Sequence, residues 1–200
     1  TFVVDKATYP DGVFVTHADL FFAKKGTSGM GVTVQLRPTL NGYPSADVIL
    51  ASSVISGPNV NVVPEGTTPS IGNSSHYTRF TFDTPEYLAT NEEYSLVVLS
   101  NSNEYEVFVG EIGKKLIGSN ATIAQQPHGG SLFKSQNARA WVSEPLEDLM
   151  FVLHRANFST EEGYVGFQLA NSAFDVIANT SYDILRVNMD YLDFDATRSE

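Results

Sequence analysis

The stretch VTVQL, residues 32–36, decides the fold class of this chain. Apolar residues occupy every second position of the stretch, and the polar residues Thr33 and Gln35 lie between them. Successive side chains of a strand point to opposite faces, so this period of two places one face in a core and the other toward solvent. The sequence therefore predicts a half-buried strand at this point.

The same alternation recurs along the chain. It is present in YTRFTF (77–82), EYEVFVG (104–110) and DLMFVLHRA (148–156), and VFVTHADLFF (13–22) is rich in the β-branched and aromatic residues that favour strands. YSLVVLS (94–100) is a nearly continuous apolar run, which predicts a strand covered on both sides. Segments rich in Gly, Pro, Asn and Ser separate these stretches, and these residues form tight turns.

Short strands joined by polar turns predict an all-β fold, specifically an antiparallel jelly-roll-like β-sandwich. SEPLEDLM (143–150) could form one helical turn, although convincing helical periodicity with caps is hard to find. In QQPHGGSLFKSQNARAW (125–141) we expect PHGG to be a turn and SLF and RAW to be the arms of a hairpin. Gln136 and Asn137 would cap its bend.

A change in charge divides the chain near Asn157. Up to that residue there are 15 acidic and 10 basic residues, whereas residues 158–200 hold 8 acidic and 2 basic residues. We therefore expect a sandwich over residues 1–157, followed at 158–200 by an acidic extended arm or the start of a second β module. Because the chain starts at Thr and ends without a closing element, we also expect it to be part of a longer polypeptide.

Composition excludes several classes of function. The net charge of -11 argues against nucleic-acid binding, which requires clustered Lys and Arg. Cysteine is absent, so disulfides and thiolate chemistry are excluded. No apolar run approaches the roughly 20 residues that span a bilayer, and the first residues lack the pattern of a signal peptide. We expect neither a nucleic-acid nor a membrane partner.

The sequence offers weak candidates for chemistry. His128 precedes two glycines, but the histidines are scattered and none has a metal-ligand spacing. The run DYLDFD (190–195) groups carboxylates without the pattern of a calcium loop. Carboxylate pairs lie near expected strand ends, where solvated turn residues are common. We expect no catalytic residues, no metal and no cofactor.

Aromatic residues supply the other candidate contacts. Tyr43, Tyr105 and Trp141 could present rings to a sugar or to a partner protein, and His128 could contact a partner from a turn at the rim. We expect most aromatic residues to fill the core or subunit interfaces, with Trp141 packing the sandwich.

Three longer segments carry a family resemblance: VTHADLFFAKKGTSGMGVTVQLRPTLNGYPS, TRFTFDTPEYLATNEEYSLVVLSNSNEYEVFVGEIG and QQPHGGSLFKSQNARAWVSEPLEDLMFVLHRANF. Their order, over about residues 10–157, resembles a jelly-roll module of the virion structural proteins of tailed bacteriophages, of the baseplate, tail-fibre or neck type. The resemblance implies a non-enzymatic building block and brings no catalytic residues.

The resemblance leads us to expect a virion location in the phage tail or neck and a homo-oligomer or symmetric assembly with other virion proteins. The alternative is a sandwich that recognises a carbohydrate, such as a cell-surface glycan, through aromatic residues on loops. A hydrolase is the third hypothesis, and it has the least support because no site assembles from the sequence.

Overall fold

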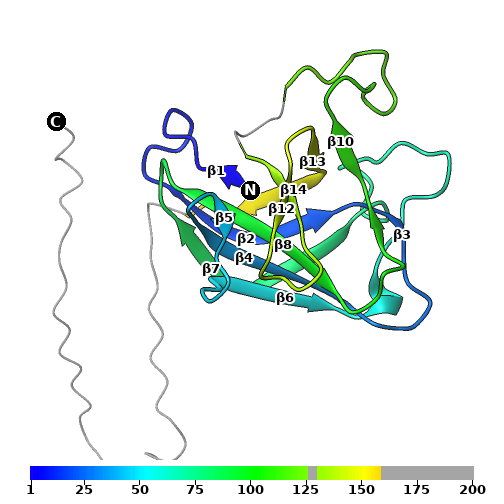
Figure 1. Cartoon of the computed structure of the whole chain (residues 1–200), viewed down its shortest axis with the longest axis horizontal. Coiled ribbons are helices and arrows are strands. Elements are labelled where there is room, and N and C mark those ends of the chain that lie inside the picture. The colour runs from blue at the N-terminus through cyan, green and yellow to red at the C-terminus, as the bar shows by residue number, and fades with distance from the viewer. Residues whose placement is uncertain (126–129, 159–200) are drawn as a thin grey trace, which may run out of the picture. The chain divides into compact units, whose positions relative to one another are not determined.

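The computed structural model describes residues 1–125 and 130–158, and these residues form an all-β fold (Figure 1). The all-β prediction is therefore confirmed. Thr1–Phe158 is one compact unit. The predicted acidic arm or second module lies outside the described residues except for Phe158, so the boundary at residue 157 stays a prediction.

Two antiparallel sheets form the layers of a sandwich. The larger sheet has the order β1 (Phe2–Val3), β8 (Glu93–Ser100), β4 (Val32–Leu40), β5 (Tyr43–Pro44), and β6 (Ala51–Ile55) also pairs with β4. The smaller sheet has the order β14 (Phe151–Arg155), β2 (Val13–Leu20), β7 (Thr78–Leu88). A short 3-10 turn, η1 (Gly57–Asn59), follows β6.

The apolar faces of both sheets pack into the core. Val32 and Val34 of β4 are buried in one cluster with Leu20 of β2 and Phe80 of β7. Thr33 lies between these valines and Gln35 follows Val34, and both are less buried. The alternation in VTVQL thus distinguishes the inner from the outer face of the larger sheet, as predicted.

Three short two-stranded ladders extend the sandwich. They are β3 (Phe22–Lys24) with β9 (Glu106–Val107), β10 (Val109–Glu111) with β13 (Glu147–Leu149), and β11 (Leu132–Lys134) with β12 (Val142–Glu144). Each ladder is antiparallel.

Three of the predicted strands are interrupted at one shared bend. The expected strands at 13–22, 104–110 and 148–156 break at Phe21, Phe108 and Met150. Backbone hydrogen bonds join these residues: the Phe108 N–H donates to Phe21 O (3.0 Å), and the Met150 N–H donates to Phe108 O (2.9 Å). Each of the three segments leaves its ladder at this bend, although its run of apolar residues in the sequence continues through the bend without a gap.

The specific jelly-roll arrangement is not confirmed. β2 pairs with β7 in one sheet, and β4 pairs with β8 in the other. Immunoglobulin-type sandwiches have this central pairing: their second strand (B) lies beside the fifth (E) in one sheet, and their third strand (C) lies beside the sixth (F) in the other. Alternating strands joined by turns are common to both arrangements, so the alternation alone does not separate them.

The helical turn that residues 143–150 could form is not present. This stretch forms β12, a turn at Pro145 and Leu146, and β13. Leu149 lies opposite Val109 in the ladder with β10. Pairing with distant strands outweighs the weak local preference for a helix. Within the described part of the chain, no helix has the length and apolar character needed to cross a membrane.

Candidate binding site

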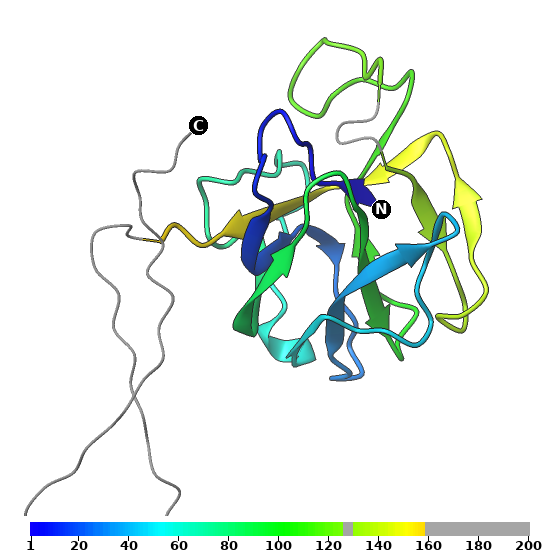
Figure 2. The ribbon, with the colours of Figure 1, turned by 90° about the vertical axis from the view of Figure 1, so that its left-hand side faces the viewer.

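The hairpin formed by β11 and β12, which we call the flap (residues 131–144), lies beside the segment that contains β5 (Figure 2). Asn137 organises its loop: the Asn137 Oδ1 atom accepts hydrogen bonds from the N–H groups of Arg139 (3.0 Å) and Ala140 (2.8 Å). Ala138 has a positive φ of 57°. Of the two residues expected to cap the bend, Asn137 does so, whereas the Gln136 side chain makes no hydrogen bond to another described residue. The second arm is Val142–Glu144 and not RAW.

The flap is fixed at its first residues and at Lys134. The Ser131 N–H donates to Thr1 Oγ1 (3.0 Å), and the Thr1 nitrogen donates to Ser131 O (2.7 Å). A Cβ on Gly130 would lie 1.7 Å from Thr1 O, so only glycine fits at this close approach of two backbones. The second glycine of PHGG therefore has a packing role that needs no ligand.

Lys134 contributes the main electrostatic contact of the flap. Its Nζ atom lies 2.7 Å from Glu147 Oε2 and 3.7 Å from Glu144 Oε1. The hydrogen bond to Glu147, with the charge of Glu144, raises the pKa of Lys134 above its ordinary value. Lys134 therefore ties the flap to β13, next to the pocket beneath it.

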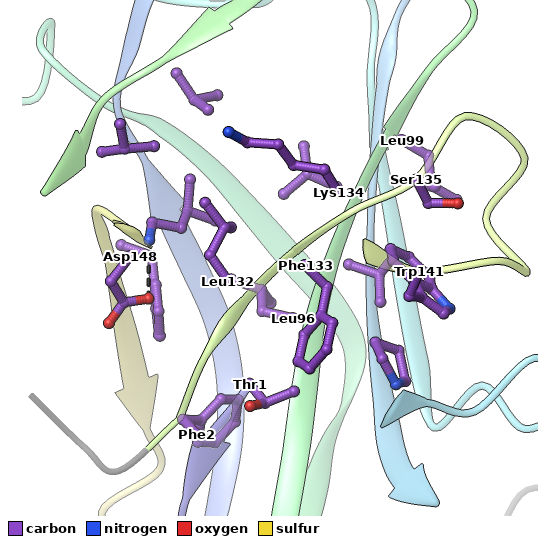
Figure 3. Close-up of a pocket in the computed structure, with 17 residues that line it drawn as sticks. Thr1, Phe2, Leu96, Leu99, Leu132, Phe133, Lys134, Ser135, Trp141 and Asp148 are labelled. Carbon is purple, nitrogen blue, oxygen red and sulfur yellow. Dashed lines mark hydrogen bonds between the residues drawn. The ribbon is translucent and has the colours of Figure 1, made fainter. Parts of the chain in front are cut away.

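A pocket of about 290 Å³ lies between the flap and β8 (Figure 3). Its walls are mainly apolar, with Lys134, Ser135 and Asp148 as polar groups. Figure 3 shows Phe133 near the centre, with Trp141 on one side and Asp148 on the other. The indole N–H of Trp141 is buried without a hydrogen-bond partner among the described residues.

The structure brings two of the four candidate contact residues to one place. The ring of Tyr43 packs on Phe133, with 5.4 Å between ring centroids, and Phe133 shares the pocket with Trp141. Tyr105 lies elsewhere: its ring packs against Phe22, and its hydroxyl donates to Met30 O. His128 lies outside the described residues.

A polar cluster lies on the other sheet, centred on Asp19 of β2. Arg79 of β7 donates to both Asp19 carboxylate oxygens (2.8 Å each), and His154 of β14 lies 2.7 Å from Asp19 Oδ2. The imidazole of His17 stacks on His154, with ring centroids 4.2 Å apart. These contacts join all three strands of the smaller sheet.

Charge and burial act in opposite directions on the pKa of Asp19. Desolvation raises it, but hydrogen bonds from Arg79 and His154 together with their charges outweigh burial, so the pKa lies below its ordinary value. The pKa of His17 is lowered, first by burial and then by the charges of Arg79 and His154. The folded protein therefore favours an ionised Asp19 and a neutral His17.

Neither site has the geometry of a metal centre. Within residues 1–125 and 130–158, no group of three or more His, Asp or Glu side chains is placed to hold a metal ion. Comparison with protein-family models, with curated proteins and with solved structures found no match to this chain.

Sequence reasoning missed Phe133 and the Asp19 cluster. The apolar residues before Lys134 predicted a strand, but nothing in the sequence predicted the contact of Phe133 with Tyr43. Asp19 lies 60 residues from Arg79 and 135 residues from His154, so only the strand pairing brings them together. The single available signal was an acidic residue inside the largely apolar stretch VFVTHADLFF.

Proposed function

We propose that this chain is a non-enzymatic structural module of a bacteriophage virion, in the tail, baseplate or neck, and that it acts through protein–protein interfaces. The observation that carries the proposal is a group of exposed apolar side chains on two neighbouring segments. Residues 40–49 around β5 form a segment that we call the tip. The exposed apolar side chains lie on the tip, on the flap and on the turn that follows the flap: Leu40, Tyr43, Val48, Ile49, Val142, Leu146.

Exposed apolar groups of this kind mark surfaces that contact other proteins. The contact of Tyr43 with Phe133 connects the tip to the flap, so the two segments can meet one partner together. The virion location rests on the sequence resemblance, and the partners would be other virion proteins or copies of this chain in a symmetric assembly.

Tyr43→Ala tests this function. Tyr43 is 49% exposed, so we expect its loss to change the free energy of unfolding by less than about 1 kcal/mol. Incorporation of the tagged full chain into virus particles should fall several-fold, because an aromatic anchor of the interface is removed. Immunoblotting of purified particles measures the incorporation.

Tyr87→Ala is the matched control. Tyr87 is 47% exposed and packs on Phe14 with ring centroids 5.1 Å apart, but it lies on β7 in the smaller sheet. We expect this variant to enter particles normally. Equal incorporation of both variants at the wild-type level would contradict a role for the tip and flap in assembly.

Glycan recognition is the second candidate function. Tyr43 offers an exposed ring, and the pocket next to it contains Trp141, whose buried indole N–H has no hydrogen-bond partner within residues 1–125 and 130–158. Rings of this kind stack against sugars. Binding on a glycan array that disappears in Tyr43→Ala and Trp141→Ala, with folding intact, would favour this function over assembly.

A further inference from the structure

A buried arginine lies at the base of the tip. Arg37 of β4 is 5% exposed and lies opposite Ser95 of β8. No carboxylate within residues 1–125 and 130–158 forms an ion pair with it. Burial lowers the pKa of its guanidinium from the ordinary value. Buried charges in proteins are usually paired with an opposite charge, so the contacts that replace such a pair at Arg37 indicate what this side chain does.

The guanidinium first contacts a side chain of its own strand. Its Nε atom donates to Gln35 Oε1 (3.0 Å), and its Nη2 atom donates to the same oxygen. Gln35 and Arg37 are two residues apart, so their side chains lie on the same face of β4. Two hydrogen bonds to one oxygen fix the plane of the rigid guanidinium. The remaining nitrogen, Nη1, therefore points in a fixed direction.

This remaining nitrogen holds the tip. Arg37 Nη1 donates to the Ser45 carbonyl (2.8 Å). Ser45 is 4% exposed and makes two further contacts: its N–H donates to Pro38 O (2.9 Å), and its Oγ accepts from the Val48 N–H (3.1 Å). The carbonyl, the amide and the hydroxyl of Ser45 are thus all engaged, and Arg37 supplies the contact to the carbonyl.

Ser45 lies between the exposed apolar residues of the tip. Tyr43 precedes it by two residues, Val48 and Ile49 follow it, and each of the three is nearly half exposed. The position of Ser45 therefore sets how these side chains are presented. For the fold alone, an apolar side chain of similar volume at position 37 would serve as well, because burying a charge costs solvation free energy. The guanidinium adds a directed contact with the tip.

We propose that Arg37 is a positioning residue of the assembly surface: its buried guanidinium holds the Ser45 carbonyl and so sets the conformation in which the tip presents Tyr43 to a partner protein. The inference rests on the proposed function, because it names the residue that prepares the same surface. Since Arg37 is 5% exposed, it acts through the tip and not by touching the partner.

Arg37→Met tests the proposal in the full chain. Methionine keeps an unbranched apolar stem but donates no hydrogen bond. We expect the thermal midpoint to stay within about 4 °C of the wild type, because removal of the buried charge offsets the lost hydrogen bonds. Hydrogen exchange at the Ser45 and Val48 amides, followed by NMR, should accelerate at least about tenfold, since both amides are bonded within the segment that Arg37 holds. Exchange along β7 should not change.

Lys25→Met is the matched control. Lys25 Nζ also donates to two backbone carbonyls, those of Pro58 (3.2 Å) and Val60 (3.0 Å), which lie outside the tip. This variant therefore loses the same charge and the same kind of contact. We expect Arg37→Met to lower incorporation into virus particles several-fold, as Tyr43→Ala does, and Lys25→Met to leave incorporation at the wild-type level.

Unchanged exchange at Ser45 and Val48 in Arg37→Met would overturn the proposal. So would normal incorporation of Arg37→Met when Tyr43→Ala is kept out of particles, and in that case the proposed function stands. Normal incorporation of both variants would remove the proposed function and the role of Arg37 with it.

Arg37→Lys takes the place of Arg37→Met if the methionine variant does not fold. Lysine keeps the positive charge but lacks the rigid fork that reaches Gln35 and Ser45 together. We expect smaller changes of the same kind in amide exchange and in incorporation. Wild-type exchange and wild-type incorporation of Arg37→Lys would then overturn the proposal.

Discussion

Phe80→Ala is expected to lower the free energy of unfolding by about 3–5 kcal/mol. Phe80 lies on β7, is 0% exposed, and packs in the cluster that contains Val34 of the facing sheet. Removing its ring loses apolar burial and leaves a cavity that the two sheets cannot fill without moving closer together. Urea unfolding followed by circular dichroism measures the change.

Phe14→Ala is the control for this prediction. Phe14 lies on β2, is 40% exposed, and contacts Tyr87 and Phe158 near the end of the sheet. We expect a loss of only about 1 kcal/mol, because much of its surface remains in water. Equal losses for Phe80→Ala and Phe14→Ala would contradict the position of the core between the two sheets.

Asp19→Ala is expected to lower the free energy of unfolding by about 2–4 kcal/mol at neutral pH. Asp19 is 3% exposed and accepts hydrogen bonds from Arg79 and His154 on the two neighbouring strands. Its removal leaves both partners without their carboxylate. The Arg79 side chain is 42% exposed and can be solvated, which keeps the loss below that of Phe80→Ala.

The same cluster predicts how stability changes with pH. The folded pKa of Asp19 is depressed, so its contribution is present above the unfolded pKa of about 3.9 and is lost as the pH falls through the folded pKa. The folded pKa of His17 lies below 6.5, so the unfolded chain takes up that proton first, and stability declines as the pH falls below about 6.5.

Urea unfolding at a series of pH values checks both steps. Asp19→Ala should reduce the loss at the lower pH, to which Asp5 and Glu104 also contribute because hydrogen bonds lower their pKa values in the fold. His17→Gln should remove the loss that begins near neutrality. Asp83→Ala, at an exposed position of β7, should follow the wild-type profile. A wild-type profile unchanged by both cluster variants would show that the contacts of Asp19 and His17 do not contribute to stability.

The residue alternation was enough to predict the all-β class but not the strand order. Val32 and Val34 are buried as their spacing predicts, because the side-chain period of a strand is a local property. The bend at Phe21, Phe108 and Met150 was not predictable, since it depends on hydrogen bonds between segments far apart in the sequence. The strand order of a jelly roll likewise depends on pairing between segments far apart in the sequence, and it was not confirmed.

The candidate site was predictable in part. Tyr43 and Trp141 were identified as aromatic residues for contact, and Phe133 brings them to one region. Their proximity depends on the flap folding over β8, which no local pattern encodes. Tyr105 lies apart from them, because its hydroxyl donates to Met30 O and its ring packs against Phe22 within the fold.

The central claim is that the tip and the flap form the surface through which this chain joins a virus particle. Hydroxyl-radical footprinting of Tyr43 and Tyr87, in the isolated full chain and in purified particles, tests it most directly. The two tyrosines have similar exposure in the chain itself, 49% and 47%. We predict that modification of Tyr43 falls several-fold in particles while that of Tyr87 stays the same. Equal modification of Tyr43 in both states, or absence of the chain from particles, would contradict the claim.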